Sequence, residues 1–355
     1  MGDYNSTVKK EGAVVGYFED NSQPSTSVDD CASQIISFID VYAYTNSEMT
    51  ALTLMVNLER NLDNNGDSVD RALFPRHCNA AFDIREAIDF PFPLCERIPT
   101  DFACQKFLED PRANTKVFWC RNVLHFIEWA NATQDLGNFT RHEKMLLIAE
   151  NFLATACLTS FYAFLRIQRE AVETAEEGTV PPPCSPEWFA EFSKLAPDAQ
   201  EWVNRVIVEV LEPMDSLDIS MEELVLMKYI IFFNGNEPSK VRSISDVHRI
   251  RCYRLKYCQL LQKYIKRHVA DPNKRIHRIS ELLRIIESVR AVSYSLDKWL
   301  TMFFTSDVCG MKDVLVYDFH VRAWNEVPVD TSTASTWNTH PPQWTSFGFQ
   351  PLNLQ

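Results

Sequence analysis

The chain has 355 residues, a formal net charge of −13 and 46% hydrophobic residues. Such a length can bury one large core or two smaller ones, and the acidic balance argues against a protein that coats nucleic acid with its whole surface. The ten cysteines include no C-x-x-C pair, which argues against a zinc module, and the first residues lack the apolar stretch of a secretory signal. We therefore expect an intracellular protein with reduced cysteines and no cofactor.

Apolar residues recur mostly at helical spacing, and short alternating strands joined by Asn-Gly turns are missing. This pattern predicts an all-α protein. Residues 1–46 begin polar and acidic, contain an ambiguous apolar run at 35–42, and are expected to be mostly disordered. A helix is predicted at 47–62, and the Pro-rich segment 89–102 is expected to be an extended connection.

Two long helices are predicted next, at 114–131 and 142–167. The first has a wide apolar face, and the second contains the only candidate membrane span, residues 145–167. Because Glu150 and Asn151 would then lie within the hydrocarbon, we interpret this run as a buried core helix and expect no membrane partner.

The second half of the chain carries several helix-boundary signals. Ser220 and Glu223 form a capping-box pattern, and Asp271-Pro272 combines an N-cap residue with proline at the first helical position. The predicted helices are 187–212 (one or two, ending near Pro213), 220–234, 243–269, 272–294, 295–305 and 311–321. The tail at 325–355 has no lysine or arginine and four prolines, so we expect it to be disordered.

One region of this acidic chain is strongly basic. Between Arg249 and Arg290 there are twelve Lys or Arg residues against three Asp or Glu residues. A DNA-binding interpretation also needs a module that enters a groove, and none is visible. We therefore favour a solvated face that pairs with acidic surfaces of this chain or of a partner.

Catalytic and metal-binding patterns are incomplete. His142-Glu143 begins a zinc motif, but Leu146 replaces its second histidine, and His125-x-x-Glu128 fits an ion pair on a helix surface. The sequence has no nucleophile elbow, no phosphate-binding glycine loop and no dinucleotide fingerprint. Nothing in it requires an enzyme.

The stretch FIEWANATQDLGNFTRHEKMLLIAENF spans the end of one predicted helix, a polar loop and the start of the next. By itself it indicates a corner where two helices pack closely, with an acidic residue favoured at the second N-terminus. Its spacing resembles the signature of nuclear hormone receptor ligand-binding domains, in the divergent nematode-type branch. The residues that carry this resemblance are Trp129, Ala130, Leu136, Phe139, Glu143, Lys144, Met145, Leu147 and Ile148.

The resemblance covers about residues 47–322 and implies one ligand-binding-like domain at 47–324. The fold that it implies is a three-layer sandwich of about ten to twelve helices. The zinc module with which such receptors bind DNA needs C-x-x-C pairs, so we expect no direct contact of this chain with nucleic acid.

The resemblance also implies a groove that binds the amphipathic helix of a coregulator, formed by Ile127, Asn131, Lys144, Leu147 and Asp318. Asn131 stands where the family usually has a lysine that grips one end of that helix. Asp318, in LVYDFH, stands where the activation helix usually has a glutamate that grips the other end. Coregulator binding of the usual kind is therefore in question, and Lys144 is a hypothetical substitute for the missing lysine.

A ligand wall is implied in the same way. Its residues are Lys116, Trp119, Cys120, Asn122, Ala156, Cys157, Ser160 and Ala163. With only Asn122 and Ser160 as polar groups facing an apolar wall, such a pocket would suit a small lipophilic ligand. Steroid-type members grip an oxygen of the ligand with an arginine placed near the Ala163 position, and the absence of that arginine argues against a steroid-type ligand. The alternative, that these residues simply fill the core, stays open.

The basic helices near the end of the domain occupy the position that the family uses to form homo- or heterodimers. The implied interface residues are Arg275, Arg278, Leu282, Leu283 and Ile286. The sequence thus predicts a transcription regulator that is located in the nucleus, or in both the nucleus and the cytoplasm, and that binds an apolar ligand and coregulator or receptor partners. The alternative is a ligand-independent protein that heterodimerises with a DNA-binding partner and sequesters it.

Overall fold

The computed structural model describes residues 47–63, 77–174, 194–195, 198–234 and 244–322. The predictions for the N-terminal segment, the acidic loop and the C-terminal tail lie outside these ranges. Within them the helices are α2 (Ser47–Asp63), α3 (Ile84–Asp89), α4 (Thr100–Glu109), α5 (Pro111–Ala132), α6 (Arg141–Thr174), α8 (Ala199–Val206), α9 (Glu212–Ser216), α10 (Met221–Phe232), α11 (Ile244–His268), α12 (Pro272–Ser306) and α13 (Val314–His320). The described residues include no strand, so the all-α class is confirmed, and these eleven helices fall within the expected number.

Helix starts follow the capping signals of the sequence. The Ser220 side chain accepts from the Glu223 backbone N–H while the Glu223 carboxylate accepts from the Ser220 N–H, which opens α10. Asp271 accepts from the backbone N–H groups of residues 273 and 274, and Pro272 follows it as the first residue of α12. Both capping predictions are confirmed.

Three predicted boundaries are wrong. The connection predicted as extended is non-helical only at 90–99, where it includes a hydrogen-bonded turn from Pro91 to Leu94. Helix α4 begins at Thr100, directly after a proline that suits the position before a helix. The helix predicted to stop near Pro213 continues to Ser216, since a π-helical turn at Ile207–Leu211 precedes the proline and places it in the first turn of α9. No break occurs near Tyr294, and α12 is continuous; the polar stretch there reflects an exposed face.

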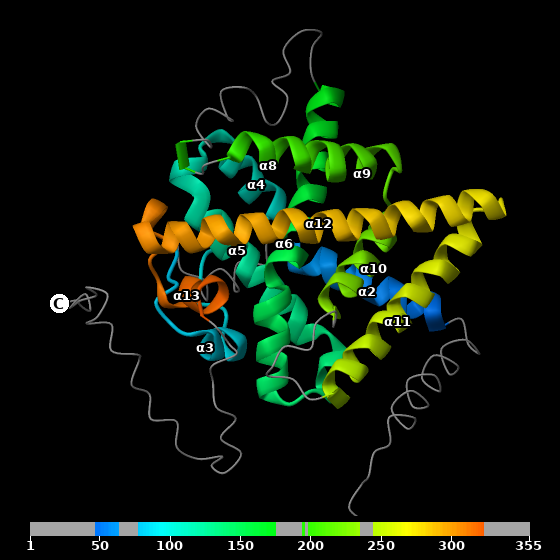
Figure 1. Ribbon diagram of the computed structural model, residues 1–355, viewed down its shortest axis with the longest axis horizontal. Coiled ribbons are helices and arrows are strands. Elements are labelled where there is room, and N and C mark those ends of the chain that lie inside the picture. Colours follow the sequence, from blue (N-terminus) through cyan, green and yellow to red (C-terminus); the bar gives the residue numbers. More distant parts are fainter. Residues whose placement is uncertain (1–46, 64–76, 175–193, 196–197, 235–243, 323–355) are drawn as a thin grey trace, which may run out of the picture.

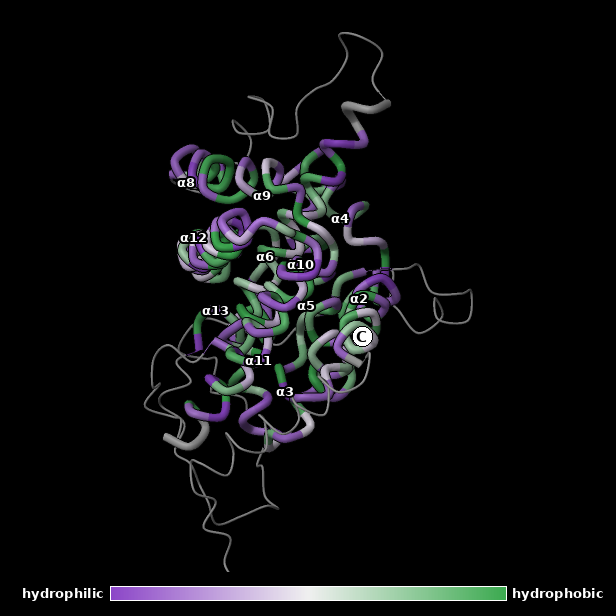
Figure 2. The backbone as a smooth tube through the Cα atoms, turned by 90° about the vertical axis from the view of Figure 1, so that its right-hand side faces the viewer, coloured by the Kyte–Doolittle hydropathy of each residue, from purple (hydrophilic) through white to green (hydrophobic). Residues whose placement is uncertain are grey.

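The helices form three layers (Figure 2). Helices α6 and α10 lie between α12 on one side and α2 and α4 on the other, and α6 contacts both α4 and α12. Figure 1 shows α12 crossing the molecule with α13 beneath one of its ends. By length and composition α6 is the one described helix that could cross a membrane, at Arg141–Glu170, but 67% of its apolar window is buried by other helices. This is the packing expected of a core helix.

Candidate functional site

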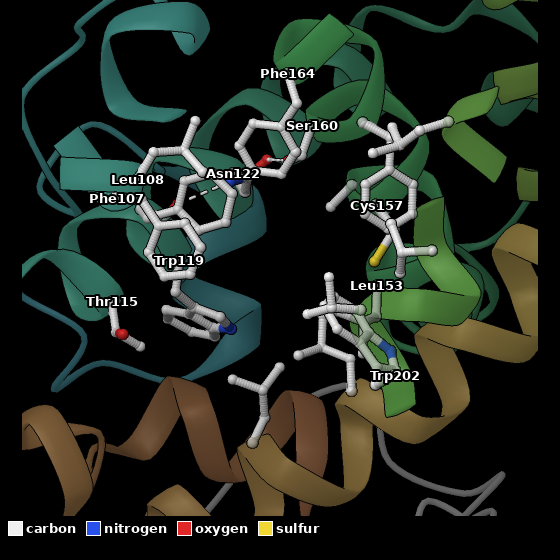
Figure 3. A pocket seen from close by; sticks show the side chains of 18 of the residues that line it. Phe107, Leu108, Thr115, Trp119, Asn122, Leu153, Cys157, Ser160, Phe164 and Trp202 are labelled. Carbon is white, nitrogen blue, oxygen red and sulfur yellow. Dashed lines mark hydrogen bonds between the residues drawn. The ribbon is translucent and has the colours of Figure 1, made fainter. Parts of the chain in front are cut away.

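The N-terminal half of α5 and the middle of α6 border an apolar cavity of about 100 Å³ (Figure 3). Helices α4, α8 and α12 and the π-helical turn complete its wall. The lining residues are Phe107, Leu108, Thr115, Phe118, Trp119, Asn122, Phe152, Leu153, Ala156, Cys157, Ser160, Phe161, Phe164, Trp202, Val203, Val206, Ile207, Leu211, Leu296, Leu300 and Phe303. A wall of this composition excludes water and binds apolar groups.

The polar side chains that face the cavity from α5 and α6, which are Thr115, Asn122 and Ser160, all form hydrogen bonds within the chain, and Thr115 donates to the Pro111 carbonyl. The Ser160 hydroxyl donates to Asn122 Oδ1 at 3.0 Å, and the Asn122 amide donates to the Phe118 carbonyl at 2.9 Å. Burial raises the pKa of the Cys157 thiol to about 12, so this cysteine stays neutral and acts as part of the apolar wall. The wall therefore offers a ligand shape and apolar surface and few free hydrogen-bonding groups.

Trp119 joins the cavity to the C-terminal helix α13. Its indole lines the cavity, and its Nε1–H donates to Nε2 of His320, on α13, at 2.8 Å. The other ring nitrogen of His320 lies 2.7 Å from Asp297 Oδ1 of α12, and the His320 carbonyl accepts from Thr301 at 2.8 Å. One hydrogen-bond network therefore connects the cavity wall to α13.

A family model for the ligand-binding domain of nuclear hormone receptors matches residues 112–303, which is more than half of the chain. The chain belongs to the nuclear hormone receptor family. The match runs from α5 to α12 and so includes most of the cavity wall. The resemblance predicted from the sequence around Trp129 is confirmed, and the protein is a nuclear-receptor-type regulator.

Five of the eight residues expected to line a ligand pocket line this cavity: Trp119, Asn122, Ala156, Cys157 and Ser160. The other three lie elsewhere. Lys116 forms an ion pair with Asp313, 2.6 Å away, at the start of α13. Cys120 is buried, and its hydrogen bond with the Cys78 thiol and its burial raise its pKa. Ala163 faces a separate polar cavity on the opposite side of α6.

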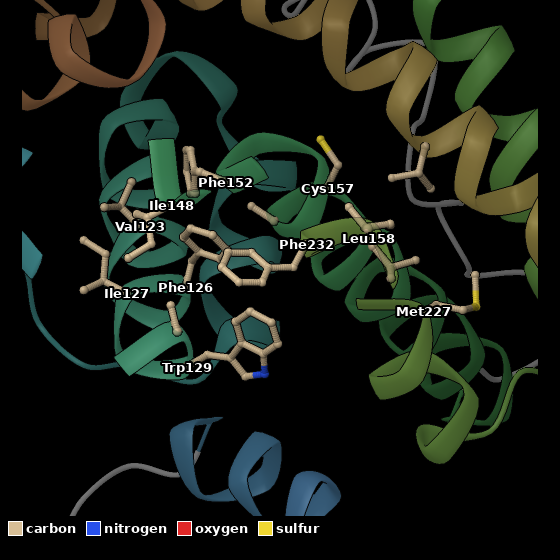
Figure 4. Packing of buried hydrophobic residues seen from close by; sticks show 14 of the residues in the cluster. Val123, Phe126, Ile127, Trp129, Ile148, Phe152, Cys157, Leu158, Met227 and Phe232 are labelled. Atoms are coloured by element: carbon tan, nitrogen blue, oxygen red, sulfur yellow. The ribbon is translucent and has the colours of Figure 1, made fainter. Parts of the chain in front are cut away.

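The receptor signature itself lies in a tightly packed region at the C-terminal half of α5 (Figure 4). Trp129 is fully buried, and its ring centroid is 6.0 Å from that of Phe126, 4.8 Å from Tyr229 and 5.3 Å from Phe232. The tryptophan of the expected corner between α5 and α6 thus packs mainly against α10. At that corner the Glu143 carboxylate accepts from the Thr140 backbone N–H, which caps α6.

A buried ion cluster lies beside Trp129. Lys228 Nζ is 2.8 Å from both carboxylate oxygens of Glu59, and its ammonium lies 4.7 Å from the Trp129 ring centroid. Nε2 of His125 is 2.8 Å from Glu59 Oε1. His125 therefore belongs to this cluster and does not form the expected surface pair with Glu128.

The charges in this cluster depend on one another. Burial alone would raise the pKa of Glu59, but Lys228 and His125 outweigh it and hold the pKa well below its ordinary value. Burial, together with the nearby Lys228 ammonium, lowers the pKa of His125. Glu59 is thus ionised, and His125 is neutral at pH 7.

The residues expected to form the coregulator groove lie around α3. Ile127 and Leu147 are fully buried, and the helices that carry them, α5 and α6, both contact α3. Asn131 and Asp318 form hydrogen bonds with the backbone of α3. Lys144 is half-buried and has no ion-pair partner within the described part of the chain.

The residues expected to form the dimer surface divide between core and surface. Leu282 and Ile286 are fully buried in this chain's own core, whereas Leu283 is exposed. Arg278 forms a two-pronged ion pair with Glu223, with nitrogen–oxygen distances of 2.6 and 2.7 Å. Arg275 donates to the carbonyl of Ala270, just before α12. Only part of the predicted set therefore faces outward.

Sequence reasoning missed the cavity residues of α4 and α8, among them Phe107, Leu108 and Trp202. Apolar spacing indicates that such residues are buried, but it does not indicate which distant helix they meet. Trp202 illustrates this, because its indole N–H donates to the Val292 carbonyl, 90 positions away. It also missed His320, whose contact with Trp119 spans 201 positions.

Proposed function

We propose that this chain is a transcription regulator of the nucleus whose state is set by a small apolar molecule in the cavity between α5, α6 and α8. The observation that carries the proposal is the double role of Trp119, which lines the cavity and also donates to His320 on α13. A ligand that moves this indole would bias the docking of α13 and so change the surface offered to partners.

The lining indicates the class of ligand. Asn122 and Ser160 use their hydrogen bonds on each other, and the remaining wall is almost entirely aromatic or aliphatic. A neutral, lipid-like molecule fits this chemistry better than a charged one, since a buried charge without a partner is costly. Pockets that hold drug-sized molecules have volumes of about 300–1,000 Å³, so a ligand of that size must push the wall outward.

The wall contains an element suited to such movement. The π-helical turn at Ile207–Leu211 interrupts the regular hydrogen bonding between α8 and α9, and such turns are frequent at functional sites. Val208, in this turn, is exposed on the outer side, so the segment is not locked between two layers. We expect ligand entry to shift this turn together with Trp202.

The second candidate function is a ligand-independent regulator that heterodimerises with a DNA-binding partner and sequesters it. The specific observation in its favour is the small volume of the cavity, about 100 Å³, which side chains of the core already nearly fill. In this case Trp119 and its neighbours would serve packing alone.

Native mass spectrometry of the purified chain separates the two candidates. The comparison uses the wild type, the cavity-filling variant Ala156→Leu and the matched control Ala154→Leu, which makes the same change on α6 away from the cavity. The ligand-dependent proposal predicts an extra mass of a few hundred daltons on the wild type and the control that is lost in Ala156→Leu and after delipidation. An unloaded wild-type mass, unchanged by delipidation, would instead favour the sequestering dimer.

A further inference from the structure

Helix α3 is held at both of its ends by side chains from other helices. At its start, Asp318 Oδ2 of α13 accepts from the Ile84 backbone N–H at 2.9 Å. At its end, Asn131 Nδ2 of α5 donates to the Ile88 carbonyl at 2.7 Å. Asp318 and Asn131 are 187 positions apart in the sequence, and they grip opposite ends of one short helix. A helix needs partners of this polarity, because its first N–H groups and last carbonyls have none within the helix.

The buried face of α3 has the spacing of a groove-binding helix. Its sequence is IREAID, and its buried side chains are Ile84, Ala87 and Ile88, which give the pattern apolar-x-x-apolar-apolar. Ile84 and Ala87 have no exposed surface, whereas Glu86 and Asp89 face solvent. Amphipathic helices that bind grooves use the same arrangement of apolar anchors on one face.

The surface beneath α3 is built from the consecutive helices α5 and α6 and from α13, which is distant from them in the sequence. Helix α3 contacts α5, α6 and α13, and in Figure 1 it lies at the end of the molecule next to α13. A backbone hydrogen bond of 3.0 Å from Leu315 to the Ala80 carbonyl ties the segment before α3 to α13. The exposed ion pair between Arg141 and Asp89 adds little, because solvent screens it.

The Asp318 carboxyl group is buried, and its hydrogen bond with the Ile84 N–H takes the place of contact with water. Burial raises the pKa of its carboxyl group, while the Ile84 N–H and the Arg322 guanidinium, 3.0 Å away, counteract that effect. If α3 left, the carboxylate would lose one of these hydrogen bonds. The first N–H groups of another helix would restore this hydrogen bond. A second helix with the same apolar spacing can therefore replace α3.

A helix of six residues is not stable alone in water, so α3 owes its form to this surface. Because it is tethered to the domain, it competes as if present at roughly millimolar concentration, the range of short flexible linkers. An external helix must therefore bind strongly or meet a chain in which α3 has been loosened.

We propose that α3 occupies in cis the groove that a partner's amphipathic helix would take, so that partner binding requires α3 to leave. The partner is a helical segment with the same apolar-x-x-apolar-apolar spacing, gripped by Asn131 at its C-terminal end and Asp318 at its N-terminal end. The inference rests on the proposed function only for the nature of this partner, a coregulator. Since Asp318 and His320 lie on the same helix, the Trp119 network holds α3 as well.

The test uses a fluorescent peptide with the chain's own sequence from residue 80 to residue 91, AAFDIREAIDFP, as the external helix. Its binding to the delipidated full-length chain is compared among the wild type, Ile84→Ser/Ile88→Ser and the exposed-face control Glu86→Ser. If α3 occupies the groove in about nine-tenths of the molecules, the double variant binds the peptide about tenfold more tightly than the wild type and the control. Adding Asp318→Ala to the double variant should reverse most of this gain.

Equal peptide binding by the wild type and the double variant, or no binding by either, would overturn the proposal. A second measurement does not depend on the folding of variants: hydrogen exchange of the wild type at residues 84–90 with saturating peptide. The proposal predicts faster exchange of the chain's own α3 as the peptide binds, and unchanged exchange would contradict it. No lipid is present in either assay, so a failure of the ligand proposal would not affect these results.

Discussion

The two halves of α5 face different kinds of interior. The N-terminal half, which carries Trp119 and Asn122, faces a cavity with apolar walls and empty space. The C-terminal half, which carries His125 and Trp129, packs against aromatic rings and the ion pair of Glu59 with Lys228, and the cavity beside it is lined by the charged side chains of this cluster. One helix therefore combines a region that can adapt with a region that fixes the fold.

The physical difference lies in what each contact demands. Dispersion contacts between apolar side chains have no preferred direction, so a wall of such residues can repack around a guest. A buried charge has to keep its partners within hydrogen-bond distance, because without a partner nothing compensates for the free energy lost on removing the charge from water. An apolar wall that can repack around a ligand and a charged cluster that cannot rearrange thus lie on adjacent turns of α5.

The largest expected effect comes from breaking the ion cluster. Replacing Glu59 with alanine leaves the Lys228 ammonium buried without a carboxylate, and such losses typically lower the free energy of unfolding by about 3–5 kcal/mol. Urea unfolding measures this change. The control is the double variant Glu59→Leu/Lys228→Met, which removes both charges and should recover most of the loss. A single variant less than about 1 kcal/mol below the wild type would mean that the pair is hydrated or flexible.

A matched pair of substitutions compares the two halves directly. Ala130→Leu inserts a larger side chain where the structure has no space, and overpacking of this kind costs about 1–3 kcal/mol of unfolding free energy. Ala156→Leu adds the same atoms toward the cavity and should cost less than about 1 kcal/mol, because the space accepts them. Thermal or urea unfolding of both variants measures the two losses of unfolding free energy. Equal losses would show that the cavity is not usable space.

The pH dependence of stability gives a smaller effect. Burial lowers the pKa of His125 below its ordinary value of 6.5, so the unfolded chain binds a proton there that the folded chain does not. Stability should therefore fall as the pH drops below about 6.5, by up to roughly 1.4 kcal/mol per pH unit for this group. Glu59, with its lowered pKa, adds a further loss below about pH 4.5.

The variant His125→Gln isolates the histidine contribution, because glutamine can donate to Glu59 but does not titrate. Urea midpoints at a series of pH values between 7.5 and 5 should fall less steeply in this variant than in the wild type. Parallel slopes would assign the acid sensitivity to other groups.

Local signals in the sequence predicted much of the fold. The capping box at Ser220 and the N-cap residue Asp271 determine where α10 and α12 begin because a cap involves residues only two or three positions apart. Helix α3 was not predicted, since six residues carry too little periodicity. Its N-cap residue Asp83 is local, but Asp318, 234 positions away, accepts from its first N–H, and no local pattern reports that contact.

The site was predictable to the extent that the family signature fixed positions along α5 and α6. That spacing placed Trp119, Ala156 and Cys157 beside one another, and all three line the cavity. It could not show that Asn122 and Ser160 would bond to each other. It also could not show that Asn131 and Asp318 would bind the two ends of a helix of the same chain, because this depends on the path of the segment before the Pro-rich connection.

The link between the cavity and α13 is tested most directly by hydrogen exchange of the α13 amides, residues 314–320, in two matched tryptophan variants. Trp119→Phe and Trp202→Phe each remove one indole N–H from the cavity wall, but only the Trp119 indole donates to α13, whereas that of Trp202 donates to the Val292 carbonyl. If the Trp119 hydrogen bond holds α13 in place, the α13 amides exchange faster in Trp119→Phe and at the wild-type rate in Trp202→Phe. Equal exchange in the two variants would contradict the link between the cavity and the C-terminal helix.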